Sequence, residues 1–297
     1  MSHSTEILCI GSVLWDIIGR SRAVMREGSD VPGRITRIPG GVVMNVAMTL
    51  RRFNMSPVLL TAVGEDPEGH ELINAANRMG LDTRYVYHSA DLPTDRYMAV
   101  EGANGLIAAI ADAHSLEAAG DKILAPLADR RLGSADAPYA GPVALDGNLT
   151  STLLAEIATS PLFARADLRV APASPGKAER LQPLLATANA TIYVNLEEAG
   201  YLCHKSFATA PEAAAELLTR GAAQVLVTNG GEAAAHATPK GVITAQPPRV
   251  LVTRVTGAGD TFMAAHIAAE VAGTAPEEAL AAALDAAATY VSGDVPS

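Results

Sequence analysis

The sequence predicts a doubly wound α/β fold, in which a mostly parallel sheet lies between helices and carries a small antiparallel β lid. Beyond residue 120, short apolar segments alternate regularly with alanine-rich helical segments, as in α/β proteins. Nearer the start, residues 34–38 alternate polar and apolar side chains, which is typical of an antiparallel strand with one wet face. No repeat or flexible linker divides the chain. We therefore expect one domain over residues 1–297, with lid segments near 12–18, 31–39 and 95–111.

The predicted strands are short runs rich in β-branched and aliphatic residues, bounded by glycine or polar turns. Expected buried strands lie at residues 7–11, 58–63, 143–145, 168–171, 191–194, 224–228 and 250–255. The Asn104-Gly105 pair predicts a hairpin that joins lid strands at residues 97–101 and 106–111. Expected helices lie at residues 42–53, 68–79, 151–158, 177–187, 211–219, 261–272 and 276–290. Gly80 follows the second helix at the position where a left-handed glycine commonly ends one.

The composition is that of an ordinary globular protein, because 49% of the residues are hydrophobic and 18% are charged. The formal net charge of −10 disfavours nucleic-acid binding, since an acidic surface repels the phosphate backbone. No apolar run reaches the ~18 residues that a membrane span needs, and the first residues lack a signal pattern. We therefore expect a soluble, cytoplasmic protein. Cys9 and Cys203 lie among apolar residues, which predicts buried thiols in a reducing compartment.

The strongest chemical feature is Thr256-Gly257-Ala258-Gly259-Asp260, which follows a predicted strand and opens a long predicted helix. The small residues let a ligand approach the backbone closely, and amides at a helix N-terminus bind anions. A carboxylate beside such a cradle is what phosphoryl transfer to an alcohol needs, because it accepts the hydroxyl proton. The structural alternative is a tight strand-to-helix turn in which the helix dipole favours Asp260.

This segment resembles the second signature of the ribokinase-like (PfkB) carbohydrate kinase family, whose usual form is Asp-Thr-Thr-Gly-Ala-Gly-Asp. Further segments resemble family motifs over nearly the whole chain and in the family's order. They are Asp16 after Gly11-Ser12, Gly40 to Ala47, Val63 to Gly69, Asn195 to Glu198, and Thr228 to Gly231. The resemblance implies a ribokinase-like fold and a kinase that uses ATP and Mg²⁺.

The resemblance also implies a role for individual residues. The implied catalytic residues are the base Asp260 and the anion hole of Gly257, Ala258 and Gly259. The implied substrate-binding residues are Asp16, Gly41, Asn45 and Asp112. Asn195, Thr228, Gly230 and Thr256 would lie along the nucleotide, and Asn195 with Glu198 would organise Mg²⁺ and its waters. Structural alternatives remain open, because Asp16 could end a strand, Asn45 could lie on the wet side of a helix, and Glu198 could belong to a capping box.

Several segments resemble the pseudouridine kinases within this family. They are Ser29 to Ile35, Thr94 to Tyr97, Asn104 to Asp112, Asp146 to Asn148, and Val255 before the Gly-Ala-Gly-Asp motif. This resemblance implies that pseudouridine is converted to pseudouridine 5′-phosphate. Alternatives are a ribose, fructose or adenosine-type kinase, or a non-catalytic binding relative. A nicotinamide-dependent dehydrogenase is disfavoured, because Gly11 is not followed by the expected Gly-x-Gly-x-x-Gly.

Two further features concern ions and assembly. Arg254 stands where the family usually has an aspartate associated with a monovalent cation, so the resemblance leaves K⁺ activation uncertain. The lid is expected to expose an apolar face formed by Val13, Trp15, Ile35 and Ile38, which a monomer would have to cover. We therefore expect a homodimer in which two lids pack together, with a small polyol or nucleoside and ATP as the other partners.

Overall fold

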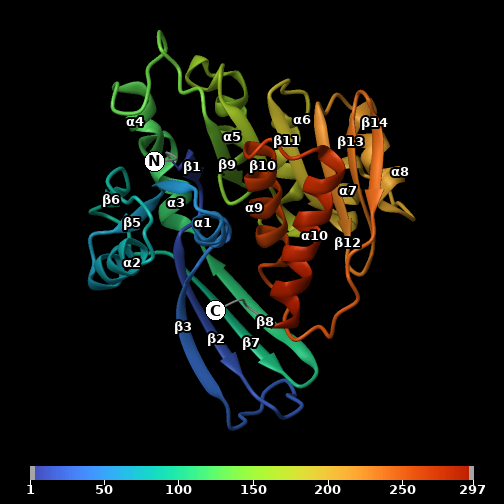
Figure 1. Ribbon diagram of the computed structural model, residues 1–297. Coiled ribbons are helices and arrows are strands. Elements are labelled where there is room, and N and C mark those ends of the chain that lie inside the picture. Colours follow the sequence, from blue (N-terminus) through green and yellow to red (C-terminus); the bar gives the residue numbers. More distant parts are fainter. Residues whose placement is uncertain (1–3, 294–297) are drawn as a thin grey trace.

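Eight strands form the central sheet of the computed structural model, which describes residues 4–293 (Figure 1). Its strands, in spatial order, are β14 (Gly241–Ala245), β13 (Glu232–Thr238), β12 (Gln224–Asn229), β11 (Ala190–Asn195), β10 (Asp167–Ala171), β9 (Pro142–Asp146), β1 (Glu6–Ile10) and β4 (Ser56–Leu60). The strands from β12 to β4 are parallel, whereas β13 and β14 extend the sheet in antiparallel pairs. The predicted mostly parallel α/β sheet is confirmed.

Helices cover both faces of this sheet, and each face has its own apolar core. One face packs against α3 (His114–Ala119), α4 (Ala125–Ala128), α5 (Ser151–Thr159), α6 (Gln182–Leu185), α7 (Leu196–Cys203) and α8 (Ala210–Thr219). The other packs against α1 (Val42–Arg52), α2 (Pro67–Arg78), α9 (Ala258–Val271) and α10 (Pro276–Ser292). Strand side chains alternate between the cores, since Leu8 and Ile10 enter the first and Ile7 and Cys9 the second.

The lid is a four-stranded sheet that extends away from the central sheet (Figure 1). Its strands, in spatial order, are β3 (Arg34–Gly40), β2 (Leu14–Arg20), β7 (Arg96–Gly102) and β8 (Gly105–Asp112), and a separate pair joins β5 (Ala62–Gly64) to β6 (Tyr87–Ser89). The prediction that Val13 and Trp15 are exposed is wrong, because both pack into the core beside α1 and α2. Ile35 and Ile38 are exposed, as expected.

Three predictions of secondary structure are wrong. Residues 250–255 form no strand. Their apolar side chains are largely exposed, and Thr253 N donates to Val291 O at 2.8 Å, at the end of α10. Strand β13 was not expected, because the alanine run of residues 233–235 lacks the β-branched residues typical of strands; β14 was missed although Val242, Ile243 and Thr244 are β-branched. The helix expected over residues 177–187 is a 3₁₀ segment, Pro175–Leu181, followed by the single turn of α6.

The prediction that the cysteines are buried thiols is confirmed, since Cys9 and Cys203 are both buried and free. Burial raises the pKa of each thiol, so both are protonated near neutral pH. Among residues 4–293, no helix has the length and apolar character needed to cross a membrane.

Candidate active site

Asp260 lies in the first turn of α9, at the start of the helix that the sequence motif opens. The cap residue Gly257 has a φ of +90°, a left-handed conformation that glycine adopts without strain. A Cβ on Gly257 would also lie 2.6 Å from the hydroxyl of Tyr290, which donates a 2.9 Å hydrogen bond to Thr256 O. Both the backbone conformation and the contact with α10 therefore require glycine at this position.

The start of α9 offers room for an anion. A helix of this length leaves N–H groups without intrahelical partners in its first turn, and these groups attract negative charge. The amide of Ala258 already donates a hydrogen bond of 3.0 Å to Val255 O. A Cβ on Gly259 would meet nothing within 4 Å, so open space lies beside that residue. A phosphate-sized group therefore has room next to the helix start.

Asn45 and Asp260 meet although they are far apart in the sequence. Nδ2 of Asn45, on α1, donates a hydrogen bond of 2.8 Å to Oδ2 of Asp260. The pKa of Asp260 is raised to about 7 overall, and burial is the largest cause. The hydrogen bond from Asn45 lowers the pKa, whereas the negative charges of Asp146, Asp16 and Glu198 raise it. A carboxylate with a pKa near the working pH is suited to accept a proton from a hydroxyl group.

Asp16 lies on β2 where the lid joins the body, and two glycines make room for it and its neighbours. A Cβ on Gly40 would overlap the Asp16 carboxylate. The next residue, Gly41, has a φ of +96°, and a Cβ there would lie 2.5 Å from Ser12 O. Burial raises the pKa of Asp16 to about 6. The structure therefore brings Asp16, Gly41 and Asn45 to the same end of the lid.

A buried carboxylate that the sequence reasoning did not include among the site residues supports this arrangement. Asp146, at the end of β9, accepts hydrogen bonds from Ser12 N at 2.8 Å, Ser12 Oγ at 2.7 Å and Val43 N at 3.2 Å. It therefore ties β9 to the start of the lid and to the start of α1, which carries Asn45. The signal in the sequence was a polar residue that directly follows the buried run Val143 to Leu145.

Asn195 and Glu198 form a capping box at the start of α7. Asn195 Oδ1 accepts a 2.8 Å hydrogen bond from Glu198 N, and Glu198 Oε2 accepts one of 2.8 Å from Asn195 N. The capping box that was the structural alternative for Glu198 is therefore present, but it uses only one of the two Glu198 carboxylate oxygens. Burial raises the pKa of Glu198 to about 7. The second carboxylate oxygen of Glu198 is a hard oxygen ligand of the kind that Mg²⁺ prefers.

Three of the four residues expected along the nucleotide, Asn195, Thr228 and Gly230, lie at the ends of neighbouring strands, whereas Thr256 directly precedes the cap residue of α9 and follows no strand. Thr228 on β12 is in register with Asn195 on β11, and Gly230 follows β12 with a φ of +56°. A cleft of 640 Å³ opens beside them. Its lining includes Leu196, Glu197, Lys205 and Asn229.

Asp112 is not brought to this site. Asp112 on β8 pairs with Arg96 on β7. Tyr97, which follows Arg96 on β7, pairs with Asp16 on β2. Because strand side chains alternate between faces, Asp112 lies on the opposite face of the lid from Asp16. Asp112 Oδ1 lies 2.6 Å from Nδ1 of the exposed His114. Tyr97, which the sequence reasoning did not propose as a site residue, shares the Asp16 face instead.

The sheet, the lid and the helix start with its half-buried carboxylate define the ribokinase-like fold. Solved structures with this fold align over nearly the whole chain. The ribokinase of Thermotoga maritima aligns with a TM-score of 0.80 at 19% identity, over 99% of this chain and 96% of that one. An Arabidopsis thaliana ribokinase complexed with ribose and ATP aligns with a TM-score of 0.79 at 22% identity, over 99% and 94%.

The family model described as pfkB family carbohydrate kinase matches residues 4–294, so the chain belongs to that family. The pseudouridine kinase of Escherichia coli K12 is 33% identical over 81 residues, which are 27% of this chain and 26% of that protein. An uncharacterized sugar kinase of the same organism, YeiI, is 27% identical over 156 residues, which are 52% and 41%. The aligned part of this chain spans less than half of either relative. The family implies a sugar or nucleoside acceptor and the use of ATP.

Proposed function

We propose that this kinase transfers the γ-phosphoryl group of ATP to the 5′-hydroxyl of pseudouridine, giving pseudouridine 5′-phosphate and ADP. The half-buried pair of Asn45 on α1 and Asp260 at the start of α9 carries the proposal, because it places a base with a pKa of about 7 beside a helix N-terminus. Partial likeness to pseudouridine kinases from two organisms supports the choice of acceptor.

Asp260 acts as the base in this proposal. As the bond forms between the 5′-oxygen and the γ-phosphorus, the hydroxyl proton passes to the Asp260 carboxylate, and the bond to the β-phosphate oxygen breaks so that ADP leaves. The amides at the start of α9 offset the negative charge on the transferring group. The hydrogen bond from Asn45 favours the ionised form of Asp260, which is the form able to accept the proton.

Glu198 and Asn195 hold Mg²⁺ in this proposal, together with water. Glu198 suits this role because it is buried and keeps one carboxylate oxygen outside the capping box. A bound Mg²⁺ offsets charge on the phosphates of ATP. Thr228, Gly230 and Thr256 line the path of the nucleotide.

Asp16 binds hydroxyl groups of the substrate, and Tyr97 provides a surface for its base. The two residues are in register on β2 and β7, and the negative charge of Asp16 contributes to the raised pKa of the Tyr97 hydroxyl. A partly buried aromatic ring beside a hydroxyl-binding carboxylate suits a ribose that carries a planar base. A ribose kinase is the second candidate, because solved ribokinases share the fold over 99% of the chain.

The lid also provides the surface for a proposed homodimer. On the face opposite Asp16, Ile17 pairs with Met98, and Met98 pairs with Ile110. Ile110 is 64% exposed and the nearby Ile35 is 77% exposed, so this face exposes an apolar patch in a single chain, beside the charged side chains of Arg37, Arg96 and Asp112. A second lid of the same shape would cover it.

The test is ADP release from Mg-ATP with pseudouridine, uridine, adenosine, ribose or fructose as acceptor, with the Asp260→Asn variant as control. We expect turnover on pseudouridine that is at least ~10³-fold lower in the variant, while ATP binding persists. Turnover confined to ribose would support kinase activity but refute pseudouridine as the acceptor. Equal rates for the wild type and Asp260→Asn would refute the role of the base.

A further inference from the structure

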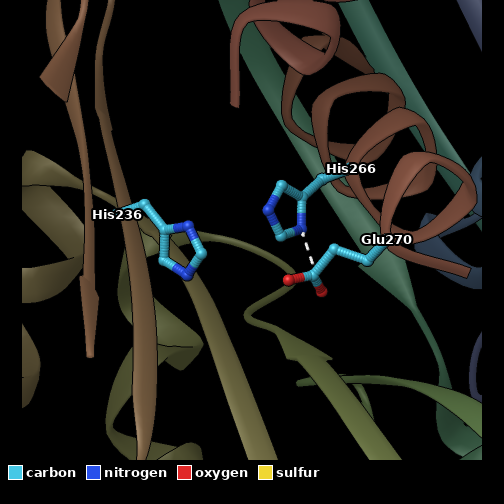
Figure 2. A group of neighbouring side chains, drawn as sticks. All are labelled: His236, His266 and Glu270. Carbon is cyan, nitrogen blue, oxygen red and sulfur yellow. Dashed lines mark ion pairs between the residues drawn. The ribbon is translucent and has the colours of Figure 1, made fainter. Parts of the chain in front are cut away.

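A second polar cluster lies near the other end of α9 from the kinase site. His266 and Glu270 follow Asp260 by six and ten residues on the same helix, so their Cα atoms lie about 9 and 15 Å further along its axis. His236 reaches them from β13, and the ligand atoms of these three side chains lie within 4.8 Å of one another (Figure 2). The family motifs involve none of these residues.

Hydrogen-bond donors from the sheet identify the electron-pair acceptors in this cluster. Arg169, which has no acceptor atom, donates to the Tyr193 hydroxyl, and that hydroxyl lies 2.9 Å from Nδ1 of His266. The simplest assignment has the Tyr193 proton pointing at His266, which leaves a lone pair on Nδ1. Two nitrogens and a carboxylate can therefore present lone pairs toward one region.

The Gln224 amide occupies the middle of that region. Its Nε2 lies 2.8 Å from Nε2 of His236 and 3.1 Å from Oε1 of Glu270. A neutral amide that bridges an imidazole nitrogen and a carboxylate oxygen holds a position where a cation would meet both groups. Gln224 is the first residue of β12, and its side-chain amide takes no part in the backbone pairing of that strand.

The charge state of the cluster also suits a cation. Arg169 is shared between Asp167 and Glu270, which leaves one net negative charge among these three residues. A divalent ion would offset that charge.

Two nitrogens of the cluster lack partners. Nδ1 of His236 and Nε2 of His266 are buried and make no hydrogen bond within the part of the chain that the structure describes. A purely structural network of buried histidines pairs its nitrogens. The two rings lie edge to face with their centroids 5.3 Å apart, and His266 is directed at Glu270 (Figure 2). Because Nδ1 of His266 and Nε2 of His236 accept hydrogen bonds, the two unpartnered nitrogens carry the ring protons. An ion would therefore bind through the accepting nitrogens and replace the hydrogen bonds from Tyr193 and Gln224.

Solvent has access to this cluster. A cleft of 850 Å³ is lined by His236 and Glu270, with Asp167 and Gln224 where two parallel strands begin. The cleft opens at the amino ends of these strands, whereas Asn195 and Thr228 of the kinase site lie at the carboxyl ends. An ion can therefore enter without passing through the kinase site.

We propose that His236, His266 and Glu270 form a binding site for a borderline divalent transition-metal ion of the Zn²⁺ class, separate from the Mg²⁺ of the kinase reaction. Two imidazoles and one carboxylate are a ligand set that Zn²⁺ and Co²⁺ prefer, and Mg²⁺ does not. Arg169 donates a hydrogen bond to Glu270 and so orients that ligand from outside, as such partners do in metal sites. The bound ion joins β13 to α9 and so stabilises the helix that carries Asp260.

The test is a Co²⁺ titration of metal-depleted protein without an affinity tag, in excess Mg²⁺, followed by visible absorption. We expect one equivalent to bind with ligand-field bands, and Zn²⁺ to displace it and raise the melting temperature. His236→Gln and Glu270→Gln each weaken binding at least ~10-fold, because each removes one ligand. Glu270→Gln retains the shape of the side chain, so it serves if His236→Gln fails to fold.

The matched controls are His114→Gln, which removes an exposed histidine, and Glu198→Gln, which alters the kinase site. Neither variant should change the Co²⁺ spectrum. The absence of ligand-field bands would overturn the proposal, and so would bands that persist unchanged in both His236→Gln and Glu270→Gln. Loss of the bands in Glu198→Gln would assign the ion to the kinase site instead. None of these readouts depends on the identity of the phosphate acceptor.

Discussion

Asn45 holds Asp260 through a 2.8 Å hydrogen bond that spans 215 positions of the sequence. Burial and neighbouring carboxylates raise the pKa of Asp260, and Asn45 provides the hydrogen bond that lowers it. Asn45 is itself placed by α1, whose first turn is tied to Asp146 through Val43 N. The ionisation of the proposed base therefore depends on a helix near the start of the chain.

The Asn45→Ala variant should need a higher pH for activity. Removing a hydrogen bond that favours the carboxylate raises the Asp260 pKa above about 7. We expect the acidic limb of the kcat profile to move up by about one pH unit, as loss of a hydrogen bond to a charged group predicts. The measurement is kcat against pH, with Asn77→Ala on α2 as the control. An unshifted limb in Asn45→Ala would show that another group controls it.

The Asp260→Asn variant should be more stable than the wild type at alkaline pH. The Asp260 pKa is about 7 in the folded protein against an ordinary value of 3.8, so between these values the folded state holds a proton that the unfolded state has released. Stability therefore falls as the pH rises through this window, and the loss is complete above it. We expect a gain of about 1–3 kcal/mol for Asp260→Asn at pH 8, shrinking towards pH 4, in urea unfolding. A gain that does not depend on pH would contradict the assigned pKa.

Local features of the sequence predicted much of this fold, whereas contacts between distant segments were harder to foresee. The helix start at Gly257 was predictable because its small residues and its acid are adjacent in the sequence. The Asn45–Asp260 pair joins segments that only the folded chain brings together, so the resemblance suggested a role for each residue but the sequence did not predict their hydrogen bond. Asp112 was proposed from resemblance, without considering which face of its strand the side chain occupies. The register of β7 and β8 places it on the face of the lid opposite Asp16. The exposed run at residues 250–255 shows that apolar, β-branched composition forms a strand only where a partner strand is available.

Activity should not require K⁺. The guanidinium of Arg254 lies 3.9 Å from the centroid of the Tyr290 ring, and its Nε donates a 2.7 Å hydrogen bond to Tyr290 O. A fixed cation next to the proposed anion hole repels a monovalent cation at the same place. We expect equal rates in potassium chloride and in N-methylglucamine chloride at matched ionic strength. An activation of ~5-fold or more that is specific to K⁺ would refute this prediction.

The isolated protein should be a dimer that a charge on the outer lid face dissociates. Ile110→Glu places a carboxylate in the apolar patch formed by Ile17, Met98 and Ile110, where a second lid would bury it at high cost. Light scattering after size-exclusion chromatography should give twice the chain mass for the wild type and the chain mass for the variant. Val242→Glu, on an exposed site of β14, is the control. A monomeric wild type at micromolar concentration would refute the dimer.

The Gly257→Ala variant should lose most of its activity, because its new Cβ would lie 2.6 Å from the Tyr290 hydroxyl and the backbone φ of +90° strains any other residue. Moving the start of α9 misplaces both the amides and Asp260, and we expect kcat to fall about 10²-fold. The double variant Gly257→Ala/Tyr290→Phe separates the two causes, since it removes the hydroxyl and leaves the strain. The kcat of the double variant is compared with that of Gly257→Ala, and Tyr290→Phe alone serves as the reference for loss of the hydroxyl. A kcat higher in the double variant than in Gly257→Ala would show that the contact with α10 positions the helix start. Full activity in Gly257→Ala would mean that this turn does not take part in phosphoryl transfer.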